Sequence, residues 1–573
     1  MIIWPGLRRS VSAIQRLFNS ASFYAPLTHS LVPERGTGSP TFTRASTATF
    51  TDWEGVLRTV PSGCARFEGA RMVRNLLTDT TDASAASWTK ETVAVSGTTI
   101  TANVGAGNHW TYQAFTPVAG NTFIGQAKVK AGTANWVALG WGNAAVVEGV
   151  FFNVSTGIKG TTNGAISGEI TGPDSSGYYT CSIVKTSVTG FLSVEIHTSD
   201  NQALAFVAAG TETIHVKSLQ LEDVTGQADQ TASEYVSVGV LSAPYHGAGV
   251  DGVKYFNTDR DGAVIPAATN TGYLAEGART QILATADIRD MTTAAWTLGA
   301  TMTRARTSVG ADGAANSATR LTGGAVAATN NCYTTVVAAA SSRTYSALVK
   351  RVTGTGPVRI VQTGTETDIS TQLNTTGYAL VQLNASILNA VMGFKIDTNG
   401  DAIDVDFNQF EAGAFASSRI AAAVTRAADV LTYPSAGNID GTVGWCYAEI
   451  VTNSQANHAF VGFDTSNQLM SQSNQRVSMY DGANQAVSTS TIMFGAQFKG
   501  AVTWGSDGVR ATVNGEAPGS NASFDGNAVD GKANIYIGEW SDGSSSNFGT
   551  IRNVRIGQRQ LSASEMQAIT AAV

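Results

Sequence analysis

The sequence predicts an all-β chain of tandem antiparallel β-sandwiches, preceded by a short helical attachment segment. Three observations lead to this fold class. Apolar and polar residues alternate in short runs, as in residues 191–197 and 379–385, and Gly, Asn, Asp and Thr interrupt these runs. Segments with helical periodicity are short and few. Several landmarks recur in the same order along the chain, which indicates an internal duplication.

Composition argues against two classes of protein. Of the 573 residues, 14% are charged and 43% are hydrophobic, and this length predicts about three to four domains. Low charge combined with this hydrophobic content argues against disorder. The net charge is −7, and acidic and basic residues are interspersed along the chain. A nucleic-acid partner would need a basic face, so none is expected.

Residues 1–41 form the predicted attachment segment. No apolar run is long enough for a signal peptide or a membrane span, so no membrane insertion is expected. An apolar stripe at helical spacing lies opposite Arg8, Arg9 and Arg16. A helix packed on the protein's own body, a segment docked into a larger assembly and, less favoured, a membrane-surface helix all fit this pattern. The stripe, taken as the attachment candidate, consists of Leu7, Val11, Ile14 and Leu17.

The repeated landmarks define two copies of one unit, at roughly residues 42–235 and 255–427. The Glu-Gly-Ala-Arg run at 68–71 recurs at 276–279. An Ile-x-Val-x-x-x-Gln-x-Glu pattern at 214–222 matches 403–411 without a gap. We therefore expect the two copies to superpose, with Gln220 and Glu222 placed like Gln409 and Glu411.

Residues 430–573 have a different pattern. Strand-like runs alternate with an Asn-Gly pair at 514–515, the strongest short signal for a hairpin because both turn positions tolerate φ > 0. Near the end, Ser562 and Glu565 have the spacing of a capping box. We expect a two-sheet module that ends in a short helix after Leu561.

This last module resembles the concanavalin A-like, laminin-G-type jelly roll. The resemblance rests on Ala-Val-Thr-Trp at 501–504, Val-Asn-Gly at 513–515, Tyr-Ile-Gly at 536–538, Phe-Gly-Thr-Ile at 548–551 and Leu-Ser-x-x-Glu at 561–565. It covers about 140 residues and implies a fold more than a ligand, because this fold hosts lectins, enzymes and purely structural domains.

The repeated unit resembles modules of phage tail-fibre and minor structural proteins. The residues that carry this resemblance are 43–49, 52–57, 68–71, 75–77 and 425–430. In that group the core between them is similar to carbohydrate-binding jelly rolls. The expected domains are an attachment segment (1–41), a first jelly-roll repeat with its lead-in (42–235), a linker with a second lead-in (236–284), a second repeat (285–429) and the laminin-G-type module (430–573).

The resemblance implies a bacteriophage virion protein assembled in the cytoplasm of the bacterial host. Its expected role is a tail or capsid fibre that binds a host-surface glycan. The expected protein partners are other virion proteins, through the N-terminal segment, and further copies of the chain, most simply as a homotrimer. The alternatives are a decoration protein that binds only virion proteins and a polysaccharide depolymerase.

No catalytic motif, cofactor or metal site is expected. Four cysteines are scattered singly and predict reduced, buried thiols: Cys64, Cys181, Cys332 and Cys446. The six histidines form no metal-binding motif. Calcium is conceivable near Asp464 or Asp542, but Asp542 lies between Ser541 and Gly543 with no second carboxylate close by, so no metal is assigned. Asp404 and Asp406 have the i, i+2 spacing of a carboxylate pair. We favour solvent-facing charge over a catalytic dyad, because His215 and Lys217 occupy the matching positions in the first copy.

Glycan recognition would use aromatic rings beside polar side chains. Trp88 and Trp296 recur in both copies, so core packing accounts for them best. Tryptophans without a counterpart in the second copy are better candidates for a site. The predicted glycan-binding residues are Trp110, Trp136, Trp141, Trp540 and Asp542.

Overall fold

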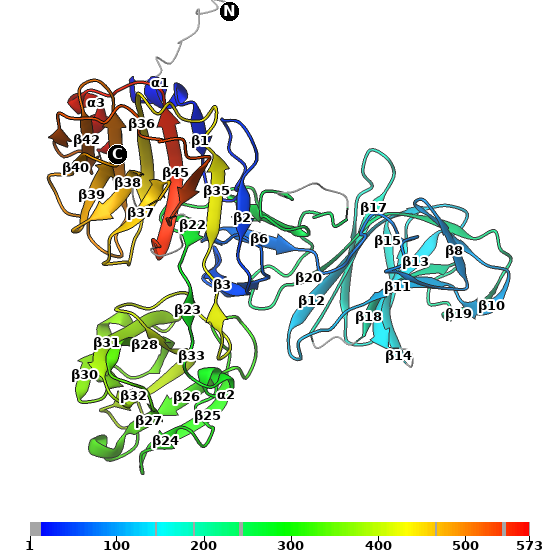
Figure 1. Ribbon diagram of the computed structural model, residues 1–573. Coiled ribbons are helices and arrows are strands. Elements are labelled where there is room, and N and C mark those ends of the chain that lie inside the picture. Colours follow the sequence, from blue (N-terminus) through cyan, green and yellow to red (C-terminus); the bar gives the residue numbers. More distant parts are fainter. Residues whose placement is uncertain are drawn as a thin grey trace, which may run out of the picture.

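The computed structural model describes residues 13–143, 146–186, 190–239, 245–464, 467–540 and 546–571. The described chain is almost entirely antiparallel β-structure, as expected, and forms three lobes that meet at a common junction (Figure 1). Two lobes are the repeated sandwiches, and the third contains both the N-terminal segment and the C-terminal module. Within the described residues, none of the helices is long and apolar enough to cross a membrane.

The third lobe, here called the central sandwich, has the two expected sheets, but four of its strands come from outside residues 430–573. One sheet contains β43 (Gly519–Asn521), β42 (Val509–Val513), β41 (Phe498–Trp504), β36 (Gly444–Ile450), β45 (Gly549–Gly557), β22 (Gly272–Ala275) and β5 (Phe67–Glu68), with β1 (Phe23–Ala25) also paired to β45. The other contains β2 (Thr41–Thr43), β35 (Val430–Pro434), β44 (Asn534–Ile537), β37 (His458–Gly462), β38 (Gln468–Ser473), β39 (Arg476–Tyr480) and β40 (Gln485–Val487).

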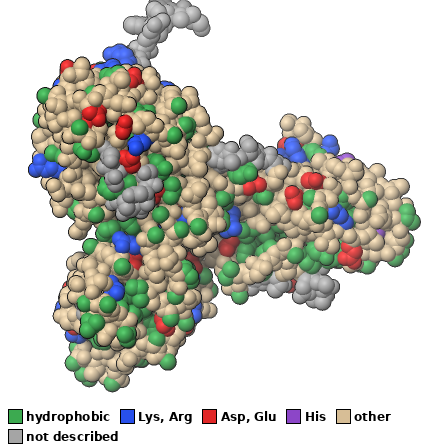
Figure 2. All heavy atoms as spheres, viewed as in Figure 1, with side chains coloured by type: hydrophobic (Ala, Val, Ile, Leu, Met, Phe, Trp, Pro, Cys, Tyr) green, Lys and Arg blue, Asp and Glu red, His purple; other side chains and the backbone are tan. Residues whose placement is uncertain are grey.

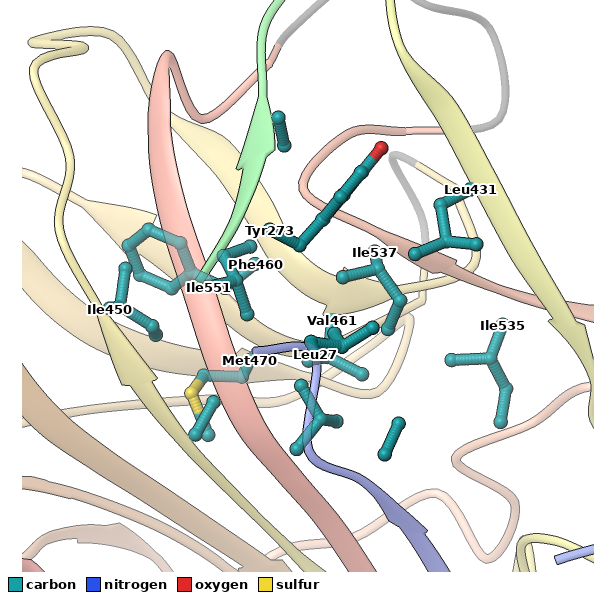
Figure 3. Close-up of a cluster of buried hydrophobic side chains, with 14 of the residues drawn as sticks. Leu27, Tyr273, Leu431, Ile450, Phe460, Val461, Met470, Ile535, Ile537 and Ile551 are labelled. Carbon is teal, nitrogen blue, oxygen red and sulfur yellow. The ribbon is translucent and has the colours of Figure 1, made fainter. Parts of the chain in front are cut away.

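The expected domain boundaries therefore need correction. Leu27 and Tyr273 lie in the same buried cluster as Ile450 and Ile551 (Figure 3). The lead-in regions also form short ribbons: β3 (Ala48–Thr51) with β4 (Leu57–Val60), β6 (Arg71–Arg74) with β21 (Val253–Phe256), and β23 (Arg279–Thr280) with β34 (Thr425–Arg426). Irregular sequence in these regions reflects short strands that complete a distant sheet, and not flexible linkers.

The local predictions for the C-terminal module are confirmed. Asn514 and Gly515 both have positive φ, at 49° and 81°, in the turn after β42. Helix α3 (Ala563–Thr570) follows Leu561 and begins with a capping box between Ser562 and Glu565. Trp504 is fully buried in the core.

The N-terminal helix α1 (Ala13–Asn19) packs on the chain's own central sandwich. Leu17 is buried in a small cluster with Trp445, Met566 and Ile569, beside α3. Ile14, by contrast, is 36% exposed. The interpretation as a helix on the protein's own body thus holds for Leu17, while Leu7 and Val11 lie outside the described residues.

The first sandwich contains two six-stranded sheets and a small ribbon. One sheet has β16 (Ser167–Thr171), β17 (Tyr179–Thr186), β12 (Thr122–Ala131), β20 (Thr213–Asp223), β9 (Thr99–Ala102) and β8 (Val93–Ser96). The other has β15 (Ile158–Asn163), β14 (Val146–Asn153), β13 (Trp136–Asn143), β18 (Phe191–His197), β11 (Trp110–Ala114) and β7 (Thr89–Glu91). The ribbon joins β10 (Gly105–Asn108) to β19 (Ala205–Ala208).

The second sandwich has the same topology with fewer strands. One sheet has β25 (Thr303–Ser308), β26 (Ala318–Thr322), β33 (Ala402–Ala412), β28 (Ser341–Thr353) and β31 (Ala379–Ile387). The other has β24 (Thr297–Leu298), β27 (Asn331–Val336), β32 (Ala390–Ile396), β29 (Val358–Gln362) and β30 (Thr365–Asp368). Its helical turns are α2 (Thr285–Arg289), η1 (Ala327–Thr329) and η2 (Ser370–Gln372). The strand order β8-β9-β20-β12-β17 corresponds to β25-β26-β33-β28-β31, which confirms the duplication.

The duplication extends to buried hydrogen bonds. Gln220 donates to Glu222 at 2.7 Å between Nε2 and Oε1, and Gln409 donates to Glu411 at the same distance. The indole of Trp88 donates to the carbonyl nine residues earlier, and so does that of Trp296. The expectation that these residues occupy equivalent positions is confirmed.

A buried network of charges joins the second sandwich to the central sandwich. Arg66 contacts both Glu276 and Asp429, and Arg44 and Arg426 extend the network at 2.9 and 2.7 Å. These five side chains are almost completely buried. Removing one partner from such a network would leave an uncompensated buried charge, which is costly. The intact network therefore holds the two lobes in one arrangement.

Candidate functional site

One sheet of the first sandwich has an aromatic and polar face that is not part of the core. Val137, Leu139 and Val194 point into the core, so the alternate residues of β13 and β18 point to the opposite side. We call this opposite side the outer face. By strand register it carries Trp110, Tyr112, Trp136, Ala138, Gly140, Phe151, Phe191, Ser193, Glu195 and His197.

Three aromatic rings gather at one side of the outer face. The ring centroids of Trp110 and Tyr112 are 5.2 Å apart, and Phe191 lies 4.4 Å from Tyr112 and 5.1 Å from Trp110. The Trp110 indole donates to Glu91 Oε2 at 2.8 Å. Trp110 is only 4% exposed, whereas Tyr112 is half-buried. Trp110 therefore supports the accessible ring of Tyr112 more than it forms a surface itself.

A buried polar cluster lies beside these rings. Ser193 Oγ donates to Glu195 Oε1 at 2.9 Å, and His197 Nε2 lies 3.2 Å from Glu195 Oε2. His197 Nδ1 has no hydrogen-bond partner among the described residues. The serine hydroxyl contacts the carboxylate and not the imidazole, so this arrangement differs from a serine nucleophile bound to its base. All three side chains are buried, and the Phe151 and Phe206 rings lie 4.8 and 6.2 Å from the His197 ring.

A loop present only in the first copy crosses one end of the outer face. Residues 198–204, which we call the strap, follow β18 and reach β15 on the far side of β13 and β14. Asp200 accepts hydrogen bonds from the Thr161 backbone and hydroxyl at 2.8 and 3.1 Å. Gly160 lies against both Asp200 and the Trp136 ring, where a Cβ atom would approach within 2.6 Å of the ring. The strap thus packs beside Trp136.

The equivalent face of the second sandwich has different chemistry. Register places Asn331 where the first copy has Trp110, Lys395 where it has Glu195, and Arg359 where it has Ala138. Arg359 pairs with Asp397 at 2.9 Å, and Lys395 lies 3.5 Å from Glu366. Only the tyrosine is kept, as Tyr333 in place of Tyr112. The aromatic outer face therefore belongs to the first copy alone.

The predicted glycan-binding residues separate into four groups. Trp110 and Trp136 lie on the outer face, as a site there requires. Trp141 lies on the core side of the same sheet, 1% exposed, so its selection as a glycan contact is corrected. Trp540 is half-buried on the central sandwich, remote in fold from the other three. Asp542 lies outside the described residues.

The sequence alone did not single out Tyr112, Glu195 or His197. Their alternation with core residues was visible in residues 191–197. Which parity faces the core depends on how β18 pairs with β11, and a one-residue shift in register would reverse it. Pairing is a property of the folded sheet, so composition and periodicity could not identify this cluster.

The other candidate chemistry is structural. Asp404 and Asp406 are buried, not solvent-facing as expected, and they pair with Arg320 and Arg289, each at 2.9 Å. Burial raises the pKa of Asp406, although Arg289 opposes this effect. The four cysteines are buried and unpaired by disulfides, as expected. Within the described ranges, no three His, Cys, Asp or Glu side chains come together as a metal site.

A cleft lies between the lead-in and the two repeated sandwiches. This junction cleft has a volume of about 690 Å³ and is lined by β4 and β6 of the lead-in, the β11–β12 loop and the end of β20 of the first sandwich, and the 312–317 loop of the second sandwich. Leu57 N donates to Ala311 O at 2.9 Å, which ties the lead-in to the second sandwich. The polar residues that line the junction cleft include Arg58, Arg74, Asn121, Asp223, Arg289 and Arg306.

No family model and no curated protein matches this chain. Among solved structures, the tandem CBM22-1–CBM22-2 domains of Paenibacillus barcinonensis Xyn10C are 9% identical, with 61% of this chain and 99% of that chain covered and a TM-score of 0.18. Domains LG4-5 of the mouse laminin alpha1 chain are 9% identical, with 51% and 91% covered and a TM-score of 0.17.

A sialidase of Trypanosoma rangeli, solved with the inhibitor DANA, is 10% identical, with 93% of this chain and 98% of that chain covered and a TM-score of 0.21. All three TM-scores are far below 0.5. The described chain itself forms three antiparallel β-sandwich lobes.

Proposed function

We propose that this chain is a structural protein of a bacteriophage virion that binds a host-surface glycan on the outer face of its first sandwich. The observation that carries the glycan proposal is the outer face itself, with Tyr112 and Trp136 half-buried around the buried Glu195 and His197. Its counterpart in the second copy carries ion pairs instead. A duplicated fold does not need these rings, so binding explains them better than folding does.

The chemistry of the outer face suits a saccharide. The C–H faces of a sugar ring pack against aromatic rings, and Tyr112 and Trp136 remain partly accessible for such contact. Sugar hydroxyls both donate and accept hydrogen bonds, and the hydroxyl of the half-buried Tyr112 can do both. An apolar surface with a few placed polar groups is the usual design of a site for a small ligand.

The virion assignment rests on the resemblance of residues 43–49, 68–71 and 425–430 to phage tail-fibre modules. Sparse surface charge agrees with dense packing among like chains, and charged side chains are scattered on the face in view (Figure 2). The proposed location is the virion, after assembly in the cytoplasm of the bacterial host. The proposed partners are other virion proteins, through the N-terminal segment, and two further copies in a homotrimer.

Glycan binding is tested with matched variants in the two copies. Tyr112→Ala and Trp136→Ala each remove a ring from the outer face, and Tyr333→Ala removes the equivalent ring from the second copy. Losing about 50 Å² of apolar contact weakens binding by roughly 1.4 kcal/mol, or about tenfold. The measurement is binding to an array of bacterial surface glycans, with thermal unfolding as a check of folding. Equal losses for Tyr112→Ala and Tyr333→Ala, or wild-type protein that binds no glycan, would contradict the proposal.

The same preparation distinguishes the alternative functions. Release of reducing ends from a bound polysaccharide would identify a depolymerase and overturn a purely binding role. Protein that joins virions but binds neither cells nor glycan would indicate a decoration protein. These outcomes separate the three functions without reference to sequence resemblance.

Attachment and oligomeric state are tested with a deletion that leaves the central sandwich intact. Residues 23–25 form β1 of the central sandwich, so deletion of residues 1–25 would remove a strand. Deletion of residues 1–12 leaves α1 and Leu17 in place. We expect this variant to fold but not to join the particle, and light scattering should show a trimer for the full-length chain. Normal incorporation, or a monomer at micromolar concentration, would refute the corresponding part.

A further inference from the structure

The junction cleft lies where the lead-in contacts the two repeated sandwiches. Arg58 of β4 donates through Nη1 to Thr225 O of the first sandwich at 2.6 Å, and its Nε donates to Asp52 at 2.6 Å. Gly226 of the first sandwich and Gly313 of the second are so close that a Cβ on either would meet the other at under 3 Å. The two sandwiches therefore touch backbone to backbone beside the cleft, and the cleft volume of about 690 Å³ lies in the range of ligand sites.

Two guanidinium groups in this cleft have unused hydrogen-bond donors. The Arg58 side chain is 10% exposed, and its Nη2 has no hydrogen-bond partner among the described residues. Arg74, from β6, is half-buried and lines the same cleft. Within the part of the chain that the structure describes, Arg74 is the one lining cation with no ion pair, since Arg58, Arg289 and Arg306 pair with Asp52, Asp312 and Asp290.

Unused cationic donors indicate an anionic ligand. A guanidinium presents its N–H groups in a plane that matches a carboxylate. A buried N–H group that makes no hydrogen bond costs free energy, so a ligand that accepts from it is favoured. The acidic residues of the lining are already engaged. Asp223 accepts from Asn121 Nδ2 and from Thr225, and Asp312 pairs with Arg289. Glu222 accepts a hydrogen bond from Gln220 Nε2 at 2.7 Å.

The cleft also offers an acceptor for hydroxyl groups. Asn121 Oδ1 has no hydrogen-bond partner among the described residues, while its Nδ2 is held by Asp223. Apolar contact is available from Leu57, Met72 and Val118. A ligand that places a negative group beside hydroxyls would satisfy both the free donors and this acceptor.

We propose that the junction cleft is a second binding site, for an acidic saccharide whose anionic group is bound by Arg58 and Arg74. The site is distinct from the outer face, because its lining combines the lead-in with both sandwiches. It does not depend on the function proposed for Tyr112 and Trp136. Its ligand class is a sugar that carries a carboxylate or a sulfate next to free hydroxyls.

The test uses the full-length chain and defined probes. Binding of trigalacturonate, of a sulfated trisaccharide and of neutral galactotriose is measured by calorimetry. We expect binding of one or both anionic probes, weaker binding as salt increases, and no binding of the neutral one. The anionic probe that binds identifies the group, a carboxylate or a sulfate. Equal affinity for galactotriose, or no binding of either anionic probe at millimolar concentration, overturns the proposal.

Variants locate the site. Arg74→Gln removes the unpaired charge and is expected to weaken binding of the anionic probe at least about tenfold, which is the effect of roughly 1.4 kcal/mol. Arg359→Gln, on the second sandwich, is the matched control and leaves binding of the anionic probe unchanged. Arg58→Lys keeps the charge but not the fork of donors, and it is expected to weaken binding; because it also loses the bond to Thr225 O, its thermal unfolding is measured alongside binding. Loss in Trp136→Ala, with no loss in Arg74→Gln, would place the ligand on the outer face and refute this site.

Discussion

The two repeated sandwiches share a scaffold but not a surface. Both copies keep a buried Gln-x-Glu pair with the same 2.7 Å hydrogen bond and a buried Trp bonded to the carbonyl nine residues earlier. On the outer face, Trp110 and Glu195 of the first copy become Asn331 and Lys395 of the second. The features that both copies share are those that the fold requires. The features that only the first copy has indicate a function.

The same motif can also acquire opposite electrostatics. Glu68 and Glu276 begin the two Glu-Gly-Ala-Arg runs. Burial raises the pKa of Glu68 to about 7, and its hydrogen bond from Thr51 N only partly opposes this. Burial also acts to raise the pKa of Glu276, but Arg426 and Arg66 outweigh it and lower the pKa to about 2. Placement at the lobe junction, and not the motif, determines the charge.

The largest effect should come from the shared tryptophans. Trp88→Ala and Trp296→Ala each empty a site that is at most 2% exposed. We expect each to destabilise its own sandwich by about 3–5 kcal/mol, since truncating a buried aromatic leaves a cavity. Native-state hydrogen exchange, read separately for β12 and β28, measures the two losses. A loss confined to one copy would break the equivalence.

The next effect distinguishes the two glutamates by pH. The folded pKa of Glu276 is below the ordinary 4.5, so its contribution to stability is present above pH 4.5 and is lost as the pH falls toward 2. The folded pKa of Glu68 is above 4.5, so its contribution is present below pH 4.5 and is lost as the pH rises through about 7. Glu276→Gln should cost about 3 kcal/mol at pH 7, because it leaves buried arginines short of a partner.

The wild type should lose stability as the pH rises from 4.5 to about 7, because Glu68 ionises in a buried position. Glu68→Gln has no group to ionise there, so this decrease should be absent. Denaturant unfolding of both variants and the wild type across about pH 3–8 measures this difference in the free energy of unfolding. This range lies on both sides of the ordinary carboxyl pKa of about 4.5. Parallel pH profiles for the two variants would contradict the assignment of opposite charge states.

A smaller and equal effect is expected from the paired glutamines. Gln220→Ala and Gln409→Ala remove a donor to a buried glutamate and an acceptor for the backbone N–H of Val236 or Ile420. Each should cost about 1–3 kcal/mol, the penalty for buried polar groups that lose their partners. Chemical denaturation of each variant, compared with the wild type, gives the two values. Unequal costs would show that the networks differ in energy despite their matching geometry.

The smallest effect should come from the strap, which the second copy lacks. Asp200→Ala removes the two hydrogen bonds to Thr161, and these are exposed. We expect a stability change of about 0.5–1 kcal/mol but a larger change in hydrogen exchange around Trp136. Unchanged exchange at β15 would show that the strap does not hold this end of the outer face.

The sequence by itself determined the features that depend on neighbours in the chain. Alternation predicted the strands, Asn514-Gly515 predicted the turn, Ser562 and Glu565 predicted the cap, and the ungapped pattern predicted the paired glutamines. Each depends on local backbone geometry or on repetition, which a linear pattern records.

Only the tertiary structure decided where the lobes begin and which faces are buried. Leu27 and Tyr273 complete the core of a sandwich hundreds of residues away in the chain, and Trp141 faces the core while Trp136 does not. The outer face depends on strand register, and the junction cleft depends on β4, β20 and the 312–317 loop meeting in space. Long-range pairing sets both, because side chains alternate across a sheet and a single-residue shift would exchange the buried and exposed sets.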